Sequence, residues 1–110
     1  MIATDASAGA LNKGDYARLG NNQLLAANVA TGEIRRFLVG PVNCELTGIA
    51  FTPDARTLFV NIQHPGETPS ERSDPAHPRQ WSNWPDFDPG GRPRSTTVAI
   101  TRDDGGVIGS

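Results

Sequence analysis

The clearest pattern in the sequence reads Gly48-Ile-Ala-Phe-Thr-Pro-Asp-Ala-Arg-Thr-Leu-Phe-Val-Asn-Ile-Gln-His-Pro-Gly-Glu67. Two short apolar runs flank Pro53-Asp54, a pair typical of type I turns because proline is favoured at the second turn position. Phe59 lies on one face of the second run, and the opposite face carries Leu58, Val60 and Ile62. Apolar groups on both faces predict cover on both sides of this strand. The stretch therefore predicts an antiparallel hairpin in an all-β fold.

The rest of the chain also predicts short strands joined by turns, and no helix of three turns. Ile34 to Val39 follows a turn in which Gly32 supplies a positive φ, and a strand on each side of such a turn is a hairpin signal. The remaining strands are predicted at 2–4, 22–28, 47–51 and 96–101, with a short additional pairing at 107–108. The fold class is therefore all-β, built from antiparallel strands and hairpins.

Residues 65–94 are predicted to be one long proline-rich loop. Seven of the nine prolines lie between His64 and Arg94, together with many Ser, Asp, Arg and Gly residues. Loops of this length are usually functional or disordered. Segments that stay disordered are poor in aromatic residues, so part of this loop is expected to dock through Trp81, Trp84 and Phe87.

Composition narrows the classes of function. The chain has 110 residues, 36% hydrophobic residues and a net charge of -2, which suits one small domain and gives no electrostatic reason to bind nucleic acid or an anionic membrane. No apolar run approaches the roughly 18 residues of a membrane span. The start at Met1 lacks a basic region followed by an apolar stretch, so no signal peptide is expected in this chain. Cys44 is the single cysteine and is expected to be a small buried apolar side chain.

Six blocks of sequence carry a more specific signal: Gly20-Asn-Asn-Gln-Leu-Leu-Ala-Ala, Ala30-Thr-Gly-Glu-Ile-Arg-Arg-Phe-Leu-Val-Gly-Pro41, Asn43-Cys-Glu-Leu-Thr-Gly48, Phe51-Thr-Pro-Asp54, Thr57-Leu-Phe-Val-Asn-Ile-Gln-His-Pro-Gly-Glu67 and Gly91-Arg-Pro-Arg-Ser95. In order and spacing they resemble the C-terminal portion of PhoX-type alkaline phosphatases over most of the chain. The resemblance implies a six-bladed β-propeller that hydrolyses phosphomonoesters. It also implies calcium and iron in a central site, and export to the periplasm or cell exterior.

The chain is much shorter than this family. Residues 1–110 are therefore expected to be a single β-rich fragment of the propeller, with about two blades' worth of strands. A centre with several metal ions needs ligands from several blades, so we expect no turnover of p-nitrophenyl phosphate by the chain alone. Whether the chain is an enzyme by itself stays open.

Carboxylate oxygens suit hard ions such as calcium and ferric iron, and Glu45 is the best candidate ligand because it lies between a loop and a strand. The competing interpretation is a solvated charge or a salt bridge. His64 and Glu67 close the strongest strand and are candidates to line the site. For them the competing interpretation is a structural corner made by Pro65-Gly66.

Asn21 and Asn22 follow a glycine and are further candidates to line the site through their amide oxygens, with turn capping as the favoured alternative. Arg92 and Arg94 are candidates for phosphate contact because the guanidinium fork matches phosphate oxygens. Here too the alternative is favoured, in which the arginines anchor the loop to the next strand.

Two further hypotheses for the whole chain remain. One is a complete β-domain that binds a ligand or partner without catalysis. The other is self-assembly, in which copies of the chain form a homo-oligomer that buries exposed sheet faces and edges, or in which a partner supplies the missing blades.

Ala55 follows Pro-Asp, where hairpins of this propeller type usually have glycine. If its φ is positive, alanine there costs on the order of 1 kcal/mol.

Overall fold

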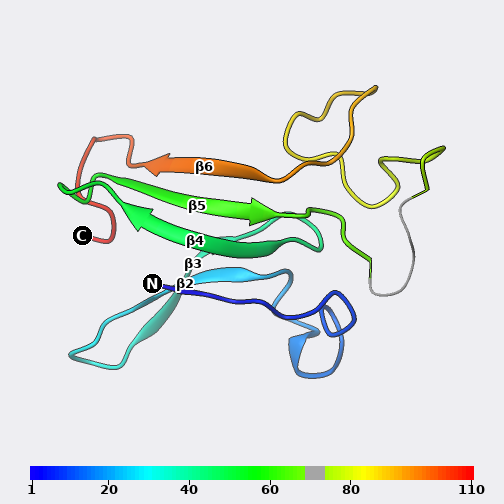
Figure 1. The fold of residues 1–110 in the computed structure, drawn as a ribbon. Coiled ribbons are helices and arrows are strands. Elements are labelled where there is room, and N and C mark those ends of the chain that lie inside the picture. Colours follow the sequence, from blue (N-terminus) through cyan, green and yellow to red (C-terminus); the bar gives the residue numbers. More distant parts are fainter. Residues whose placement is uncertain (69–73) are drawn as a thin grey trace.

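The structure is a computed structural model that describes residues 1–68 and 74–110, and it consists of two three-stranded antiparallel sheets (Figure 1). The first sheet has the order β1-β2-β3 and the second the order β4-β5-β6. The strands are β1 (Ile2–Ala3), β2 (Gln23–Ala27), β3 (Ile34–Val39), β4 (Glu45–Phe51), β5 (Thr57–Gln63) and β6 (Thr96–Thr101). Among the described residues the helical content is one short 3-10 helix, η1 (Gly14–Tyr16). The prediction of an all-β fold with antiparallel hairpins is therefore confirmed.

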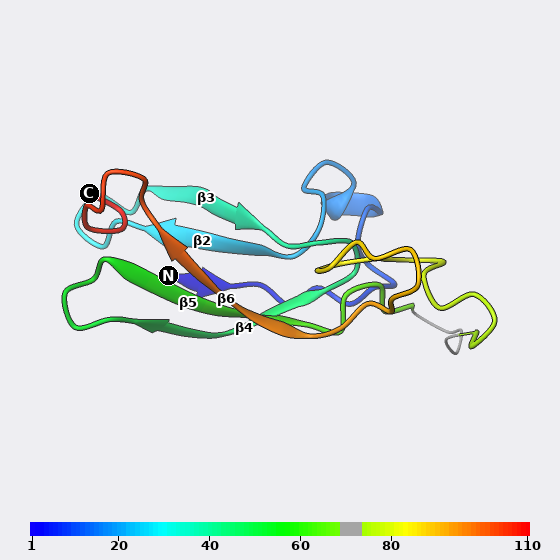
Figure 2. The ribbon, with the colours of Figure 1, turned by 90° about the horizontal axis from the view of Figure 1, so that it is seen from above.

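The two sheets pack face to face, and Figure 2 shows them as two layers. The core between them is a cluster of buried side chains to which both layers contribute: Leu24, Cys44, Leu46, Leu58 and Ile62. The alternation of β5 is confirmed, because Leu58 and Val60 are fully buried while Phe59 on the other face is 37% exposed. The first sheet thus covers one side of β5. The outer side of the second sheet stays open, so the prediction of cover on both sides is wrong for the described residues.

Both hairpin turns form as the sequence predicts. Gly32 has a φ of 75° in the β2–β3 turn, and its N–H donates to the carbonyl of Asn28. In the β4–β5 turn, the N–H of Ala55 donates to the carbonyl of Thr52 at 2.8 Å. Ala55 has a φ of 54°, so the expected cost of alanine at a positive φ applies to it.

Pairing between strands changes one predicted boundary and adds one irregularity. β4 begins at Glu45, two residues before the predicted start at Thr47, because Glu45 and Leu46 pair with the last two residues of β5. The ladder between β2 and β3 shifts register after Leu24, which pairs with Leu38. This irregularity lets the adjacent residues Phe37 and Leu38 both pack against the core, where strict alternation would separate them.

The chain near the C-terminus does not form the strand pairing predicted at 107–108. Instead, the N–H of Ile108 donates to the carbonyl of Ala55 at 2.9 Å, and its side chain packs against the core. One backbone hydrogen bond and the packing of the Ile108 side chain therefore take the place of the predicted strand pairing.

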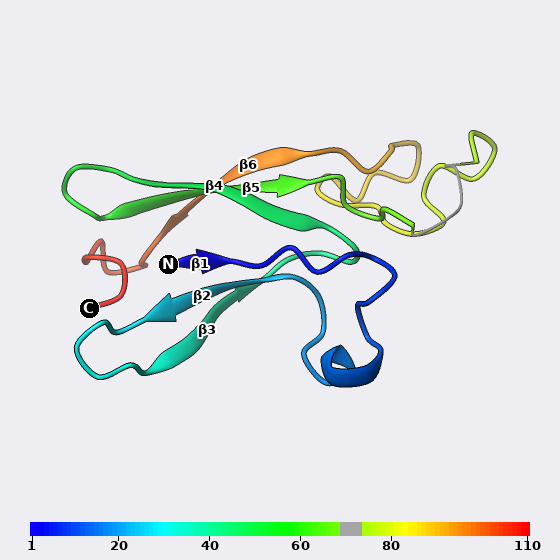
Figure 3. The same ribbon diagram turned by 60° about the horizontal axis from the view of Figure 1, so that its bottom comes forward.

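The predicted long loop lies in part outside the described residues, since 69–73 fall within it. Its described parts, 65–68 and 74–94, contain no helix or strand. Trp84 packs against the core, while Trp81 is 44% and Phe87 is 67% exposed. The loop therefore docks on the core mainly through Trp84. Figure 3 shows this loop and the loop around η1 at the same end of the two sheets, away from the two hairpin turns. Within the described ranges, no helix is long and apolar enough to cross a membrane.

Candidate functional site

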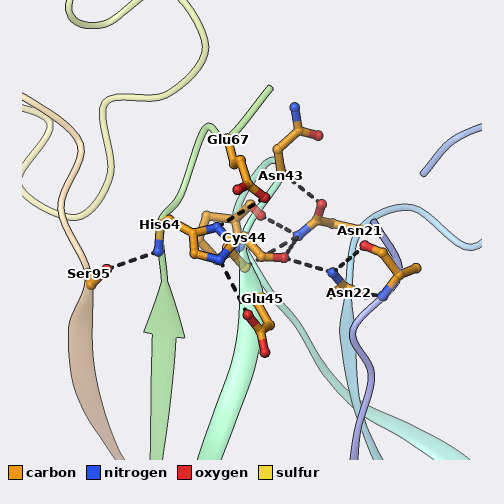
Figure 4. A network of polar contacts seen from close by, with 10 residues as sticks. Asn21, Asn22, Asn43, Cys44, Glu45, His64, Glu67 and Ser95 are labelled. Carbon is orange, nitrogen blue, oxygen red and sulfur yellow. Dashed lines mark hydrogen bonds and ion pairs between the residues drawn. The ribbon is translucent and has the colours of Figure 1, made fainter. Parts of the chain in front are cut away.

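Three predicted site residues meet at the loop-bearing end of the second sheet, and we call Glu45, His64 and Glu67 the polar corner. Glu45 opens β4 and His64 directly follows β5, so the antiparallel pairing of Glu45 with Gln63 brings them together. Nε2 of His64 lies 3.3 Å from Oε2 of Glu45, and Nδ1 lies 3.4 Å from Oε2 of Glu67 (Figure 4). The imidazole therefore stands between two carboxylates.

Local backbone geometry sets this corner. His64 has a φ of 34°, and its N–H donates to Oγ of Ser95 at 2.9 Å. Gly66 then has a φ of 83°, and its N–H donates to the carbonyl of Val42. The N–H of Glu67 donates back to the carbonyl of His64, which closes a tight turn. The turn places the Glu67 carboxylate beside the imidazole, so the structural corner made by Pro65-Gly66 is present and holds the two side chains together.

The polar corner is open to water. The side chains of Glu45, His64 and Glu67 are 23%, 37% and 52% exposed, and ion pairs this exposed contribute at most about 1 kcal/mol. Nδ1 of His64 is itself buried and lacks a hydrogen-bond partner in the described part of the chain. Its contact with Glu67 has the distance of an ion pair without the geometry of a hydrogen bond. The corner therefore combines partly exposed carboxylates with a ring nitrogen that is buried and lacks a hydrogen bond.

Asn21 and Asn22 lie behind this corner and bind mainly backbone groups. Oδ1 of Asn21 accepts from the N–H of Asn43 at 2.8 Å, and its Nδ2 donates to the carbonyl of Pro41. Asn22 is 3% exposed, and its Nδ2 donates to the carbonyl of Cys44 at 2.9 Å. The two amides hold the segment 41–44 that leads into Glu45, which matches the capping alternative.

Cys44 is buried in the core as expected, with 1% of its surface exposed. Burial raises the pKa of its thiol to about 11, although a hydrogen bond from Asn21 partly opposes the rise. A protonated, enclosed thiol is a poor nucleophile and a poor metal ligand. The described structure thus supports the structural interpretation of Cys44.

Arg94 uses its guanidinium fork within the loop. Its Nε donates to Oδ2 of Asp86 at 2.8 Å and a terminal nitrogen donates to Oδ1 at 2.9 Å. This hydrogen-bonded arginine holds the pKa of Asp86 below its usual range and raises the pKa of Arg94 in turn. Arg92 is exposed on the same segment. Arg94 therefore has the geometry of a loop anchor.

A cavity of about 560 Å³ adjoins the polar corner, and sequence reasoning did not find it. His64 and Glu67 line one side, and the loop lines the other with residues that include Trp81 and Ser95. The hydrogen bond from His64 to Ser95 spans 31 residues of sequence, so no local pattern announces it. Only the return of the loop to the start of β6 creates this wall.

The described residues contain no group of three or more His, Cys, Asp or Glu side chains arranged to hold a metal ion. Calcium takes about six to eight oxygen ligands. The polar corner offers two carboxylates and an imidazole, with its three groups paired to one another. It can supply part of a cation site and not a complete one.

Comparisons with known proteins are consistent with the sequence resemblance. The family model described as "Alkaline phosphatase PhoX" matches residues 1–66. A solved structure, Pseudomonas fluorescens PhoX in complex with vanadate, a transition state analogue, is 52% identical with a TM-score of 0.78. The similarity covers 96% of this chain and 16% of that chain. No curated protein matches the chain.

Proposed function

Because this chain belongs to the alkaline phosphatase PhoX family, we propose that it forms part of a β-propeller that hydrolyses phosphomonoesters. The chain spans 16% of the length of the similar PhoX structure, so the activity requires further blades and we expect the chain alone to be inactive. The vanadate bound to that structure supports phosphate-ester chemistry, because vanadate is described there as a transition state analogue.

The observation that carries this proposal is the polar corner, in a chain that is 52% identical to a PhoX structure over 96% of its length. Glu45 stands at the first residue of β4 and meets His64 at the end of β5, at the edge where the loops gather. Neither residue is fully buried, so a substrate or ion can approach both. A site built on strand ends is held more precisely than one on loops alone.

Within this proposal, calcium and iron are the cations, and Glu45 is the residue of this chain that binds one of them. Bound cations would neutralise the phosphate and lower the pKa of an attacking water. The donor set fits as a contribution: a carboxylate suits hard ions, but no complete ligand group exists in the described residues. Residues outside this chain would complete the site.

The residues around Glu45 act on its position. Asn21 and Asn22 fix the segment that ends at Glu45, so the carboxylate is held in place before any ligand arrives. His64 lies within ion-pair distance of both Glu45 and Glu67, so these carboxylates can orient its ring. Glu67 is the more exposed carboxylate and orients the ring from the outer side.

Partners and location follow from the same premise. The open outer face of the second sheet, on which Phe59 is 37% exposed, suits packing against a neighbouring blade. We therefore propose association with the rest of a propeller, with a homo-oligomer as the alternative occupant of this face. Export to the periplasm or cell exterior is proposed from the family alone.

A chimera tests the proposed function. This chain would replace the matching segment of Pseudomonas fluorescens PhoX, to which it is 52% identical over 96% of its length. We expect the chimera to hydrolyse p-nitrophenyl phosphate, and Glu45→Gln to lower kcat by about a hundredfold or more because a charged group at the reaction centre is lost.

Glu33→Gln is the matched control, since Glu33 is a 52% exposed carboxylate paired with Arg35 in the distant β2–β3 turn. Its activity should equal that of the unchanged chimera. An active chimera that tolerates Glu45→Gln as well as Glu33→Gln would show that the corner has no part in the reaction.

A further inference from the structure

The cavity beside the polar corner is a formed feature of the structure. Its volume of about 560 Å³ falls within the range of roughly 300–1,000 Å³ typical of small-molecule sites. The strand side presents His64 and Glu67, and the loop side presents His77, Trp81, Arg94 and Ser95. The cavity therefore begins at the proposed reaction site and continues under the loop.

Several independent contacts hold the loop wall in place. Trp84 packs against the core, and the N–H of Arg94 donates to its carbonyl at 3.2 Å. Gly66 allows a close approach of the loop, because a Cβ added there would lie 2.8 Å from Cβ of Ser82. A side chain at Gly66 would push the loop away and is disfavoured by its φ of 83°. These contacts hold the described part of the wall against the end of the second sheet.

The charged groups described in this wall are already paired. Nδ1 of His77 lies 2.6 Å from Oδ2 of Asp74, and Arg94 binds Asp86 through both ends of its fork. His64 stands between the two carboxylates of the polar corner. Among the described lining residues, no cation is left to neutralise a phosphate. The cavity wall is therefore poorly suited to the phosphate group itself.

The remaining lining suits a flat apolar group. Trp81 is 44% exposed, and Pro78 and Pro93 also line the cavity. An indole face offers a large, rigid contact surface to another ring, and aromatic pairs contribute about 0.5–1.5 kcal/mol beyond burial. Backbone and hydroxyl groups, such as Ser95, complete a mixed lining of the kind that binds small organic molecules.

We propose that this cavity receives the organic leaving group of a phosphomonoester, an aromatic ring, and that Trp81 determines the preference for it. The location of the phosphate at the polar corner rests on the proposed function, whereas binding of the ring is a property of this chain alone. The enzyme would accordingly favour aryl over small aliphatic phosphomonoesters.

The test is an NMR titration of the 110-residue chain with phenyl phosphate, phenol and inorganic phosphate, read at the backbone amides and the Trp81 indole N–H. We expect phenyl phosphate and phenol to shift the signals of Gly66, Trp81 and Ser95, and inorganic phosphate to leave the Trp81 indole signal unchanged. Trp81→Ala should weaken phenol binding about fivefold, the equivalent of a single aromatic contact. Trp81→Phe should retain most of it.

Phe87→Ala is the matched control, because Phe87 is an exposed aromatic residue of the same loop that lines the neighbouring cavity of about 490 Å³. Trp81 borders both cavities, so the signals of Gly66 and Ser95, which line only the first of the two, distinguish them. The inference is overturned if Phe87→Ala weakens phenol binding as much as Trp81→Ala does. It is also overturned if the NMR shifts are confined to residues of the neighbouring cavity, or if Trp81→Ala leaves the affinity for phenol unchanged. None of these readouts requires turnover. Loss of phosphatase activity in the chimera with ring binding intact would instead reject the proposed function and leave the ring site standing.

Discussion

Replacing Ala55 by glycine should stabilise the protein. Ala55 has a φ of 54°, and the left-handed conformation costs an ordinary residue roughly 1–2 kcal/mol. Glycine removes this cost but loses roughly 0.5–1 kcal/mol more conformational freedom on folding. The net gain in the free energy of unfolding is therefore about 0.5–1 kcal/mol.

The surrounding turn should survive this change unaltered. The hydrogen bonds of Ala55 to Thr52 and Ile108 use only its backbone, and Asp54 accepts from Thr52 Oγ1 and from the N–H of Arg56. The substitution thus removes one methyl group and a strained conformation, and no hydrogen bond. Urea unfolding followed by tryptophan fluorescence gives the free energy, because Trp84 lies against the core.

Ala50→Gly is the matched control for the same chemical change. Ala50 is an exposed residue of β4, paired with Phe59, and its φ is not positive. There glycine should lower the free energy of unfolding by roughly 0.5–1 kcal/mol. The reasoning is refuted if Ala55→Gly is neutral or destabilising, or if both variants shift stability in the same direction.

Further predictions concern two titrating groups, Cys44 and Asp86. Alkylation of Cys44 by iodoacetamide should be at least about a hundredfold slower than that of an ordinary thiol, because burial raises its pKa from 9.0 to about 11, and it should become fast in denaturant. Because the thiol has a higher pKa in the folded state than in the unfolded state, the free energy of unfolding should fall as pH rises from about 9 to about 11. Cys44→Ala should not show this fall. If the difference in stability between the unchanged protein and Cys44→Ala did not depend on pH, this prediction would be contradicted. Arg94→Ala should let the pKa of Asp86 rise to its usual range in a carboxyl NMR titration, and an unchanged pKa would show that Arg94 is not its cause. As the pKa of Asp86 is lowered by folding, the stability that this pair contributes should be present above its unfolded pKa and lost as pH falls through the folded pKa.

Local patterns predicted most of the strands. The alternation of Leu58, Val60 and Ile62 identifies the buried face of β5, because the period of two belongs to a single strand. The turn at Pro53-Asp54 is also a local feature, and it fixes which residues face each other next to the turn, up to the register shift between Thr47 and Ala50. The sequence therefore indicated Glu45 and His64 as candidates, whereas their contact depends on the pairing beyond that register shift.

Features that depend on distant contacts were not predictable. Asn22 donates to the carbonyl of Cys44, a contact over 22 residues, so its role depends on how the two sheets pack. The early start of β4 reflects pairing with Gln63, and no residue near Glu45 signals it. The cavity beside His64 requires the loop to return to Ser95. Each of these depends on tertiary arrangement rather than on local preference.

The most direct test of the central claim is anomalous diffraction from crystals of the PhoX chimera that carries this chain. If Glu45 binds a cation of the phosphatase site, the anomalous map should show an ion within about 2.0–2.6 Å of its carboxylate. The contact between Glu45 and His64, 3.3 Å in this structure, should then lengthen or break. Occupied cation sites elsewhere in the chimera, with Glu45 still paired to His64 and no ion beside it, would contradict the account.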